Sequence, residues 1–154
     1  MQDSEPDLTS SERQDFRRLA GIMVPPSTRH RVPGADDEII FADIVRSLGR
    51  DRAQVQVALA KLREMAGSPF SALDDTKAET VAMALLESKG PATFALGRTV
   101  LQCYYRDDRV IRSLGLEPRA PFPKGNTLDS GDWSLLDPVR QRPRMWRDVD
   151  GRSS

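Results

Sequence analysis

The sequence predicts an all-α protein, built as an irregular helical domain with a long, proline-rich and mostly non-regular C-terminal arm. Apolar residues recur at helical spacing through the first part of the chain. Capping residues, glycines and prolines divide that part into segments of helix length. After Gly115 the helical period is lost and prolines accumulate. We therefore expect residues 1–8 to be disordered, residues 9–115 to form the helical domain, and residues 116–154 to form the arm.

The first helix is expected over residues 10–23. Thr9 and Glu12 have the spacing of a capping box, in which a hydroxyl and a carboxylate each accept a hydrogen bond from a backbone amide that the helix leaves unpaired. The pair Pro25-Pro26 ends the helix, because proline has no amide hydrogen and forces the preceding residue out of the helical region.

Four more long helices are expected, over residues 36–49, 51–66, 76–89 and 91–106. The third of these opens on a second capping-box spacing, from Thr76 to Glu79. Gly49 and Gly67 are expected to end the helices before them, because glycine readily adopts the left-handed conformation found at helix ends. Pro91 suits a first helical position, where its missing amide hydrogen costs nothing.

The last long helix places Phe94, Gly97, Val100, Leu101 and Tyr104 at helical spacing, which predicts a buried face. Glycine inside a helix costs up to ~1 kcal/mol relative to alanine. We therefore expect another part of the chain to approach closely at Gly97, and tight packing between two helices is the ordinary cause.

The composition limits the partners and the chemistry. The 154 residues carry 23 basic and 23 acidic side chains, so the formal net charge is zero and nothing indicates binding to nucleic acid or to an anionic membrane. Cys103 is the only cysteine, which excludes an internal disulfide and a cluster of thiolate ligands. No stretch approaches the ~20 apolar residues that a membrane span needs. The acidic start, MQDSEPDLTSSE, has no signal-peptide pattern, so we expect a cytoplasmic protein.

No catalytic constellation is recognisable. GxSxG, HExxH, CxxC and a glycine-rich phosphate loop are absent, so we expect the chain to have no catalytic or metal-binding residues and to bind no FAD. His30, the sole histidine, lies between two arginines that disfavour its protonated form, and we interpret it as a loop residue rather than a base. We interpret Asp107-Asp108 as the cap of a last short helix rather than a paired-carboxylate site. Cys103 is interpreted as a small core residue rather than a nucleophile.

The arm is rich in large apolar side chains, among them Leu135, Leu136 and Val139, and a solvated tail does not carry so many. Segments of this kind are often irregular but ordered because they lie on another molecule. We therefore predict a partner-binding surface formed by these aromatic residues: Tyr104, Tyr105, Phe122, Trp133 and Trp146.

Four pieces of the sequence carry a family resemblance: FRRLAGIMVPPS, VPGADDEIIFADIV, PFSALDD and VLQCYYRDDRVIRSLGLEPRAPFPKG. They contain a helix that ends in a proline pair, a Pro-Gly-Ala step into a second helix, and a Tyr-Tyr stretch before an aspartate and a Pro-x-Gly tail. In the order and spacing of these pieces, over about residues 12–145, the chain resembles the small subunit, or subunit 3, of gluconate 2-dehydrogenase and related FAD-dependent sugar and alcohol dehydrogenases.

The resemblance implies a non-catalytic subunit of a hetero-oligomer. In that family the large flavoprotein subunit, of the glucose-methanol-choline type, binds FAD and substrate and carries out the hydride chemistry. The arm is then expected to lie on that subunit, and the chain to stabilise it and help it mature. Many such small subunits open with a twin-arginine export signal, which this sequence lacks. The resemblance therefore implies either a cytoplasmic complex or export on a signal carried by the partner.

Two other hypotheses are open at this point. The first is a free-standing helical adaptor or regulator whose arm binds an unrelated protein. The second is a small enzyme built on His30 and the Asp107-Asp108 pair. Nucleic-acid binding ranks last, because the basic run from Arg140 to Arg147 is offset by nearby aspartates.

Overall fold

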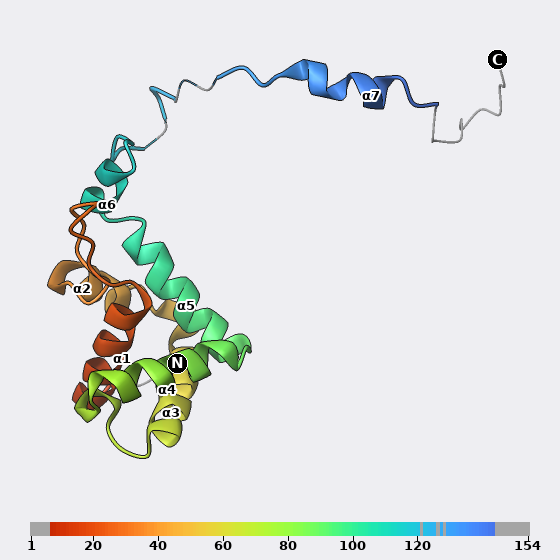
Figure 1. Ribbon diagram of the computed structural model, residues 1–154. Coiled ribbons are helices and arrows are strands. Elements are labelled where there is room, and N and C mark those ends of the chain that lie inside the picture. Colours follow the sequence, from red (N-terminus) through yellow and green to blue (C-terminus); the bar gives the residue numbers. More distant parts are fainter. Residues whose placement is uncertain (1–6, 121, 126, 128, 144–154) are drawn as a thin grey trace, which may run out of the picture. The chain divides into compact units, whose positions relative to one another are not determined.

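The computed structural model of the chain describes residues 7–120, 122–125, 127 and 129–143, and this part of the protein is all-α, as predicted (Figure 1). Its α-helices are α1 (Ser10–Met23), α2 (Glu38–Arg46), α3 (Arg52–Ala66), α4 (Asp75–Glu87), α5 (Pro91–Tyr104), α6 (Asp108–Ser113) and α7 (Asp137–Arg140). Short 3₁₀ helices lie at Gly49–Asp51 (η1), Phe70–Ala72 (η2) and Trp133–Leu136 (η3). The described residues contain no β-strand, only an isolated antiparallel bridge between Ser27 and Val32.

The chain divides into two compact units, residues 1–118 and residues 119–154, which we call the helical unit and the arm. Helices α1 to α6 belong to the helical unit, whereas η3 and α7 belong to the arm. None of the helices described is long and apolar enough to cross a lipid bilayer.

The helical unit closes an apolar core of its own. Helix α3 contacts α1, α4 and α5, while α2 packs on α5. Phe16 of α1 meets Phe41 of α2 edge to face, with ring centroids 5.6 Å apart. The largest fully buried apolar side chains come from five helices, the turn after α2 and η2: Phe16, Leu19, Ile40, Ile44, Leu48, Val55, Leu62, Phe70, Leu85, Leu96 and Val100. Burial of these groups is the main favourable contribution to folding of the unit.

Local capping chemistry sets the helix starts. The capping box of α1 is confirmed, because the Thr9 hydroxyl accepts from the Glu12 amide at 3.2 Å and the Glu12 carboxylate accepts from the Thr9 amide at 2.7 Å. The expected cap at Thr76 is wrong. Helix α4 begins earlier, because the Asp74 carboxylate accepts from the Lys77 amide at 2.9 Å and thus occupies the capping position.

Helix α2 is shorter at both ends than the predicted 36–49. The Asp37 carboxylate caps its start by accepting from two amides of the first turn, at 3.1 and 3.3 Å. After its end the chain turns into η1 at Gly49, where φ is +43°. Gly67 ends α3 as expected, with φ at +65°.

The buried face of α5 differs in part from the predicted one, because Val100 and Tyr104 are buried as expected but Phe94 and Leu101 are not. Phe94 is 68% exposed and Leu101 is 44% exposed, whereas Leu96, Val100 and Cys103 are buried. Helix α5 is apolar on more than one side, and helical spacing alone does not determine which side the neighbouring helices cover. An apolar stripe therefore lies on the surface of α5.

Candidate partner-binding surface

The exposed apolar side chains of the arm gather at η3 and α7. Asp132 begins this stretch, because its carboxylate accepts from the Ser134 amide at 3.1 Å and from the Ser134 hydroxyl at 2.6 Å. Trp133 and Leu136 are three residues apart, which places them on one side of a 3₁₀ helix, and Val139 follows at the same interval. Trp133 is 67% exposed, and the other two are also exposed. The stretch therefore presents an apolar edge to solvent.

Phe122 is a second exposed aromatic residue of the arm and lies in a tight loop. The Arg119 guanidinium donates to the carbonyl of Ala120 at 3.1 Å and to that of Gly125 at 2.6 Å. This closure leaves Phe122 85% exposed. Trp146, the remaining aromatic residue of the predicted surface in the arm, lies outside the described residues.

Tyr104 and Tyr105, at the end of α5, take different positions. Tyr104 is 5% exposed and belongs to the core, and burial raises the pKa of its hydroxyl, with further rises from Tyr105 and Asp107. Tyr105 is 56% exposed, and its ring meets the Tyr104 ring edge to face at a centroid distance of 5.3 Å. Of the two predicted surface residues, only Tyr105 is exposed, whereas Tyr104 lies in the core of the helical unit.

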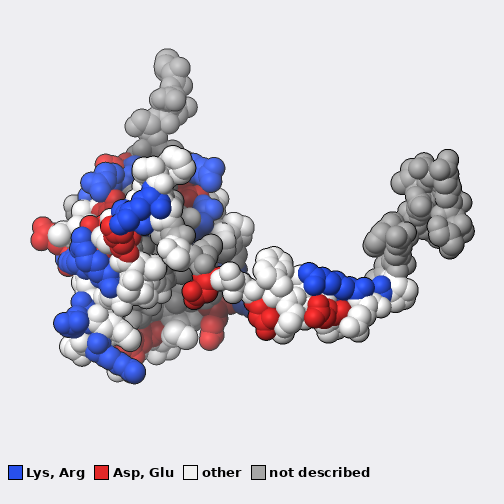
Figure 2. Space-filling view, turned by 90° about the horizontal axis from the view of Figure 1, so that it is seen from above, with Lys and Arg blue, Asp and Glu red and all other residues white. Residues whose placement is uncertain are grey.

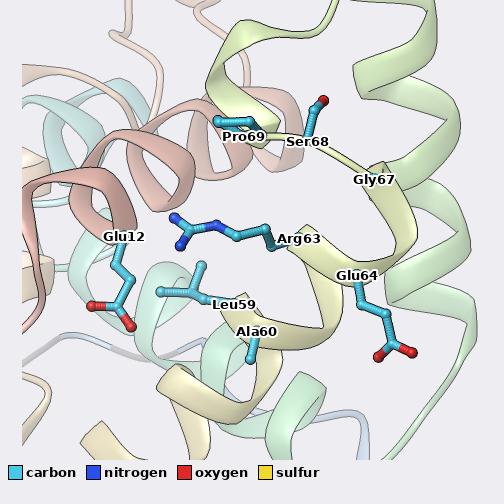
Figure 3. A pocket seen from close by; sticks show the side chains of 8 residues that line it. All are labelled: Glu12, Leu59, Ala60, Arg63, Glu64, Gly67, Ser68 and Pro69. Carbon is cyan, nitrogen blue, oxygen red and sulfur yellow. The ribbon is translucent and has the colours of Figure 1, made fainter.

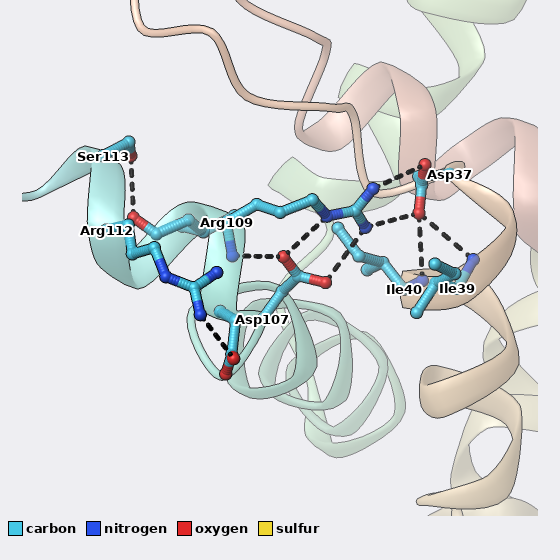
Figure 4. Close-up of polar contacts among 9 residues, drawn as sticks. Asp37, Ile39, Ile40, Asp107, Arg109, Arg112 and Ser113 are labelled. Carbon is cyan, nitrogen blue, oxygen red and sulfur yellow. Dashed lines mark hydrogen bonds and ion pairs between the residues drawn. The ribbon is translucent and has the colours of Figure 1, made fainter. Parts of the chain in front are cut away.

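Arg109 of α6 joins the end of α5 to the start of α2 (Figure 4). Its guanidinium donates to both carboxylate oxygens of Asp37, at 2.7 and 3.2 Å, and to both of Asp107, at 3.0 Å each. The hydrogen bonds from Arg109 hold the pKa values of Asp37 and Asp107 below the ordinary aspartate range. Asp107 also caps α6, accepting from the Arg109 amide at 2.9 Å, which confirms its interpretation as a helix cap. The last helix before the arm is thereby anchored.

A second polar cluster ties α5 to α2. The Arg106 guanidinium donates to the Asp43 carboxylate at 2.5 and 3.1 Å and to the Ser47 hydroxyl at 2.7 Å. It also lies 3.5 Å from the sulfur of Cys103, which is buried. Burial raises the pKa of the Cys103 thiol, and a raised pKa disfavours the thiolate that a nucleophile needs. Cys103 is therefore a core residue, as predicted.

The residues weighed as a small catalytic site are not arranged as one. Asp107 pairs with Arg109, whereas Asp108 pairs with Arg112 at 3.1 Å, so each carboxylate has its own cation and the two do not share a proton. His30 is exposed in the loop before α2, and in the described part of the chain no hydrogen bond or ion pair joins it to either carboxylate. The described residues also contain no group of acidic, histidine and cysteine side chains suited to a metal ion.

A cleft of about 590 Å³ beside α3 is spanned by Arg63, which reaches toward α1 (Figure 3). The Arg63 guanidinium donates to the Asp15 carboxylate at 2.7 and 3.2 Å and to the Ser11 hydroxyl at 2.7 Å. Asp15 is 1% exposed and also accepts from the Ser71 amide at 2.8 Å. The positive charge of Arg63 is therefore paired with a carboxylate inside the fold. Sequence reasoning missed this pair, and its one local signal was an aspartate directly before Phe16 on the apolar side of the first helix.

Acidic and basic side chains are interspersed on the face of the helical unit that Figure 2 shows. This distribution agrees with the formal net charge of zero. A face of mixed sign does not produce the single-signed potential that attracts nucleic acid or an anionic membrane.

Comparison of the chain with protein-family models, with curated proteins and with solved structures found no match. The resemblance to the small dehydrogenase subunits therefore rests on the four sequence pieces quoted above.

Proposed function

We propose that the chain is the non-catalytic small subunit of a heteromeric FAD-dependent dehydrogenase of the gluconate 2-dehydrogenase kind. Its partner is a large flavoprotein of the glucose-methanol-choline type that oxidises a sugar, a glycoside or another alcohol. The small subunit stabilises this flavoprotein and helps it mature. FAD belongs to the partner and not to this chain.

The observation that supports this proposal best is the exposure of the arm's aromatic side chains. Phe122 is 85% and Trp133 is 67% exposed, while the helical unit buries Phe16, Phe41 and Phe70 in a core of its own. Burial of apolar surface stabilises by about 25 cal/mol per Å², and exposed aromatic rings forgo that gain. A partner surface supplies it, because aromatic side chains are enriched among the residues that dominate binding at protein interfaces.

The anchoring of α6 supports the same role. Arg109 is held by two carboxylates and Arg106 by a third, so the end of α5 and the short helix after it have fixed positions in the helical unit. A binding segment that follows an anchored helix loses less conformational freedom on association than one that follows a mobile one.

The test is co-purification from the native host with the full-length, tagged chain. A flavoprotein of several hundred residues, with an absorbance band near ~450 nm, should accompany it. Deletion from Ala120 onward should abolish this recovery while leaving the circular dichroism of the helical unit unchanged. Alanine at Phe122 or Trp133 should each cost about 2 kcal/mol or more of association free energy. Val57→Ala, at an exposed apolar residue of α3, is the matched control and should bind normally.

Three outcomes would change the proposal. A truncated chain that still recovers active flavoprotein at full yield would move the contact to the helices. Recovery of an unrelated, colourless protein would favour the free-standing adaptor instead. A flavin absorbance band in the pure isolated chain would contradict the assignment of FAD to the partner.

A further inference from the structure

The apolar stripe on α5 lines a groove with a volume of about 510 Å³. Phe94, Gly97 and Leu101 of α5 line it, together with Leu86 at the end of α4. Phe94 and Leu101 are exposed within the helical unit. The groove is thus a second apolar surface, separate in sequence from the aromatic residues of the arm.

No close contact within the fold explains the glycine at position 97. Gly21, the other glycine inside a long helix, is different. A Cβ atom added at Gly21 of α1 would lie 2.9 Å from Cγ of Asp36, so a side chain at that position would force Asp36 to move. A Cβ added at Gly97 would meet only Cε of Met23, at an ordinary contact distance of 3.8 Å. The expected close helix packing at Gly97 is therefore wrong for the described fold. Glycine nevertheless destabilises the helix relative to alanine at this position.

Gly97 and three neighbouring positions of α5 have the spacing of a hole that can receive a side chain from a facing helix. Residues 94, 97, 98 and 101 follow the spacing i, i+3, i+4 and i+7, which surrounds the hole into which a facing helix inserts one side chain. Phe94 and Leu101 form its apolar ends. Gly97 leaves the floor open, so a large apolar side chain and the backbone that carries it can approach closely.

The charged residues beside the hole indicate which charge the partner helix carries next to its inserted side chain. Lys89 and Arg98 line the groove, and no carboxylate is among the lining residues. The Arg98 guanidinium lies 5.8 Å from the centroid of the Phe94 ring and is held by Asp51 at 2.5 Å. Arg98 is thus already paired, which leaves Lys89 as the cation of the groove. A second copy of this chain would bring a second Lys89 to the contact, and like charges oppose it. A helix with carboxylates next to its apolar face is complementary.

We propose that the α5 groove docks an amphipathic helix of the catalytic subunit, with one large apolar side chain over Gly97 and a carboxylate near Lys89. The inference rests on the proposed function for the identity of that partner. It adds a contact on the helical unit, distinct from the arm, that the sequence did not predict.

Substitution of Gly97 tests the groove in the full-length chain. Gly97→Ala should raise the thermal midpoint of the isolated chain, because alanine favours the helix, and should weaken binding to the purified flavoprotein by about 10-fold or more. Gly97→Leu should weaken binding further, because its side chain fills the hole. Binding is measured by titration calorimetry and folding by circular dichroism. A variant more stable than wild type that binds less well cannot owe its defect to unfolding.

Charge reversal provides the second arm of the test. Lys89→Glu should weaken binding, whereas Lys61→Glu, at an exposed lysine of α3 outside the groove, should not. The matched apolar control is Val57→Ala.

The outcomes separate this inference from the proposed function. Failure of the wild-type chain to bind any flavoprotein would overturn both. Wild-type binding that persists in Gly97→Ala and Gly97→Leu would overturn the groove and leave the proposed function intact. A dimer in sedimentation that Gly97→Leu dissociates would assign the groove to a second copy. Saturable binding of a synthetic peptide of residues 129–142, lost in Gly97→Leu, would assign it to the chain's own sequence. Both of these results overturn the proposal.

Discussion

The helical unit and the arm contain the same kinds of residues but use them differently. Phe16 of the helical unit is fully buried against Phe41, whereas Trp133 of the arm is 67% exposed. Asp37 and Arg109 join two helices of the helical unit, whereas Asp137 and Arg140 of the arm pair within one turn. The comparison teaches that the helical unit has an internal partner for its main apolar and polar groups. The described part of the arm leaves Phe122 and Trp133 exposed to solvent.

The largest difference is expected when an aromatic residue is removed from each region. Phe16→Ala should lower the free energy of unfolding by about 3–5 kcal/mol, through lost burial and the cavity left behind. Trp133→Ala should change it by less than about 0.5 kcal/mol in the isolated chain, because the ring is already in contact with water. Urea denaturation followed by circular dichroism measures both values. A large loss of stability in Trp133→Ala would mean that the arm belongs to the folded core.

A glycine-to-alanine change in each region sharpens the comparison. Gly21→Ala should destabilise by about 1–3 kcal/mol, because the new Cβ would lie 2.9 Å from Cγ of Asp36 and Asp36 must shift. Gly131→Ala in the arm should have almost no effect on unfolding, because nothing lies within 4 Å of its Cβ position. The measurement is again urea denaturation. Equal effects at both positions would show that backbone conformation, not close approach, determines the cost.

An arginine-to-glutamine change in each region tests the polar contacts. Arg109→Gln should cost about 1–2 kcal/mol of unfolding free energy, since the ion pairs are part-exposed but involve both carboxylates of the network. Arg140→Gln removes one exposed pair within a single turn of the arm and should leave unfolding unchanged.

The effect of Arg109 should depend on pH in a defined direction. Hydrogen bonds from Arg109 lower the folded-state pKa values of Asp37 and Asp107, so both carboxylates release protons more readily in the folded state than in the unfolded state. Their contribution to stability is complete above the unfolded pKa, about 4, and is lost as the pH falls through the lowered folded values. The stability difference between wild type and Arg109→Gln should therefore shrink below about pH 4. A difference that stays constant from neutral to acid pH would contradict the network.

The fold was predictable where local chemistry decides it. Thr9 with Glu12, Gly67 and Asp107 each determine a helix end through groups within a few residues, and the structure confirms them. Long-range pairs were not predictable. Asp15 and Arg63 are 48 positions apart in the chain, and they meet only after α1 has packed on α3.

The candidate surface was predictable in part and for the same reason. Composition alone indicates that the arm carries exposed aromatic residues, and Phe122 and Trp133 are exposed. Helical spacing did not predict that Tyr104 is buried and Tyr105 is exposed, because packing of the core decides which of two adjacent residues at a helix end is covered. The groove at Gly97 was hidden because α5 is apolar on more than one side, and only the packed fold shows which side stays open.

The smallest difference is expected for the capping aspartates, which make the same kind of contact in the two regions. Asp74 accepts from the Lys77 amide at 2.9 Å at the start of α4, and Asp132 accepts from the Ser134 amide at 3.1 Å at the start of η3. Asp74→Ala should lower the thermal midpoint of the isolated chain by a few degrees, because α4 packs on α3 and its end is part of the cooperative fold. Asp132→Ala should leave that midpoint unchanged and instead weaken binding of the partner, because the cap holds the turn that presents Trp133. Thr76→Ala is the control for α4, since its hydroxyl does not cap the helix. If Thr76→Ala lowers the midpoint as much as Asp74→Ala does, the start of α4 is misassigned. If Asp132→Ala lowers the midpoint, the arm is not energetically separate from the helical unit.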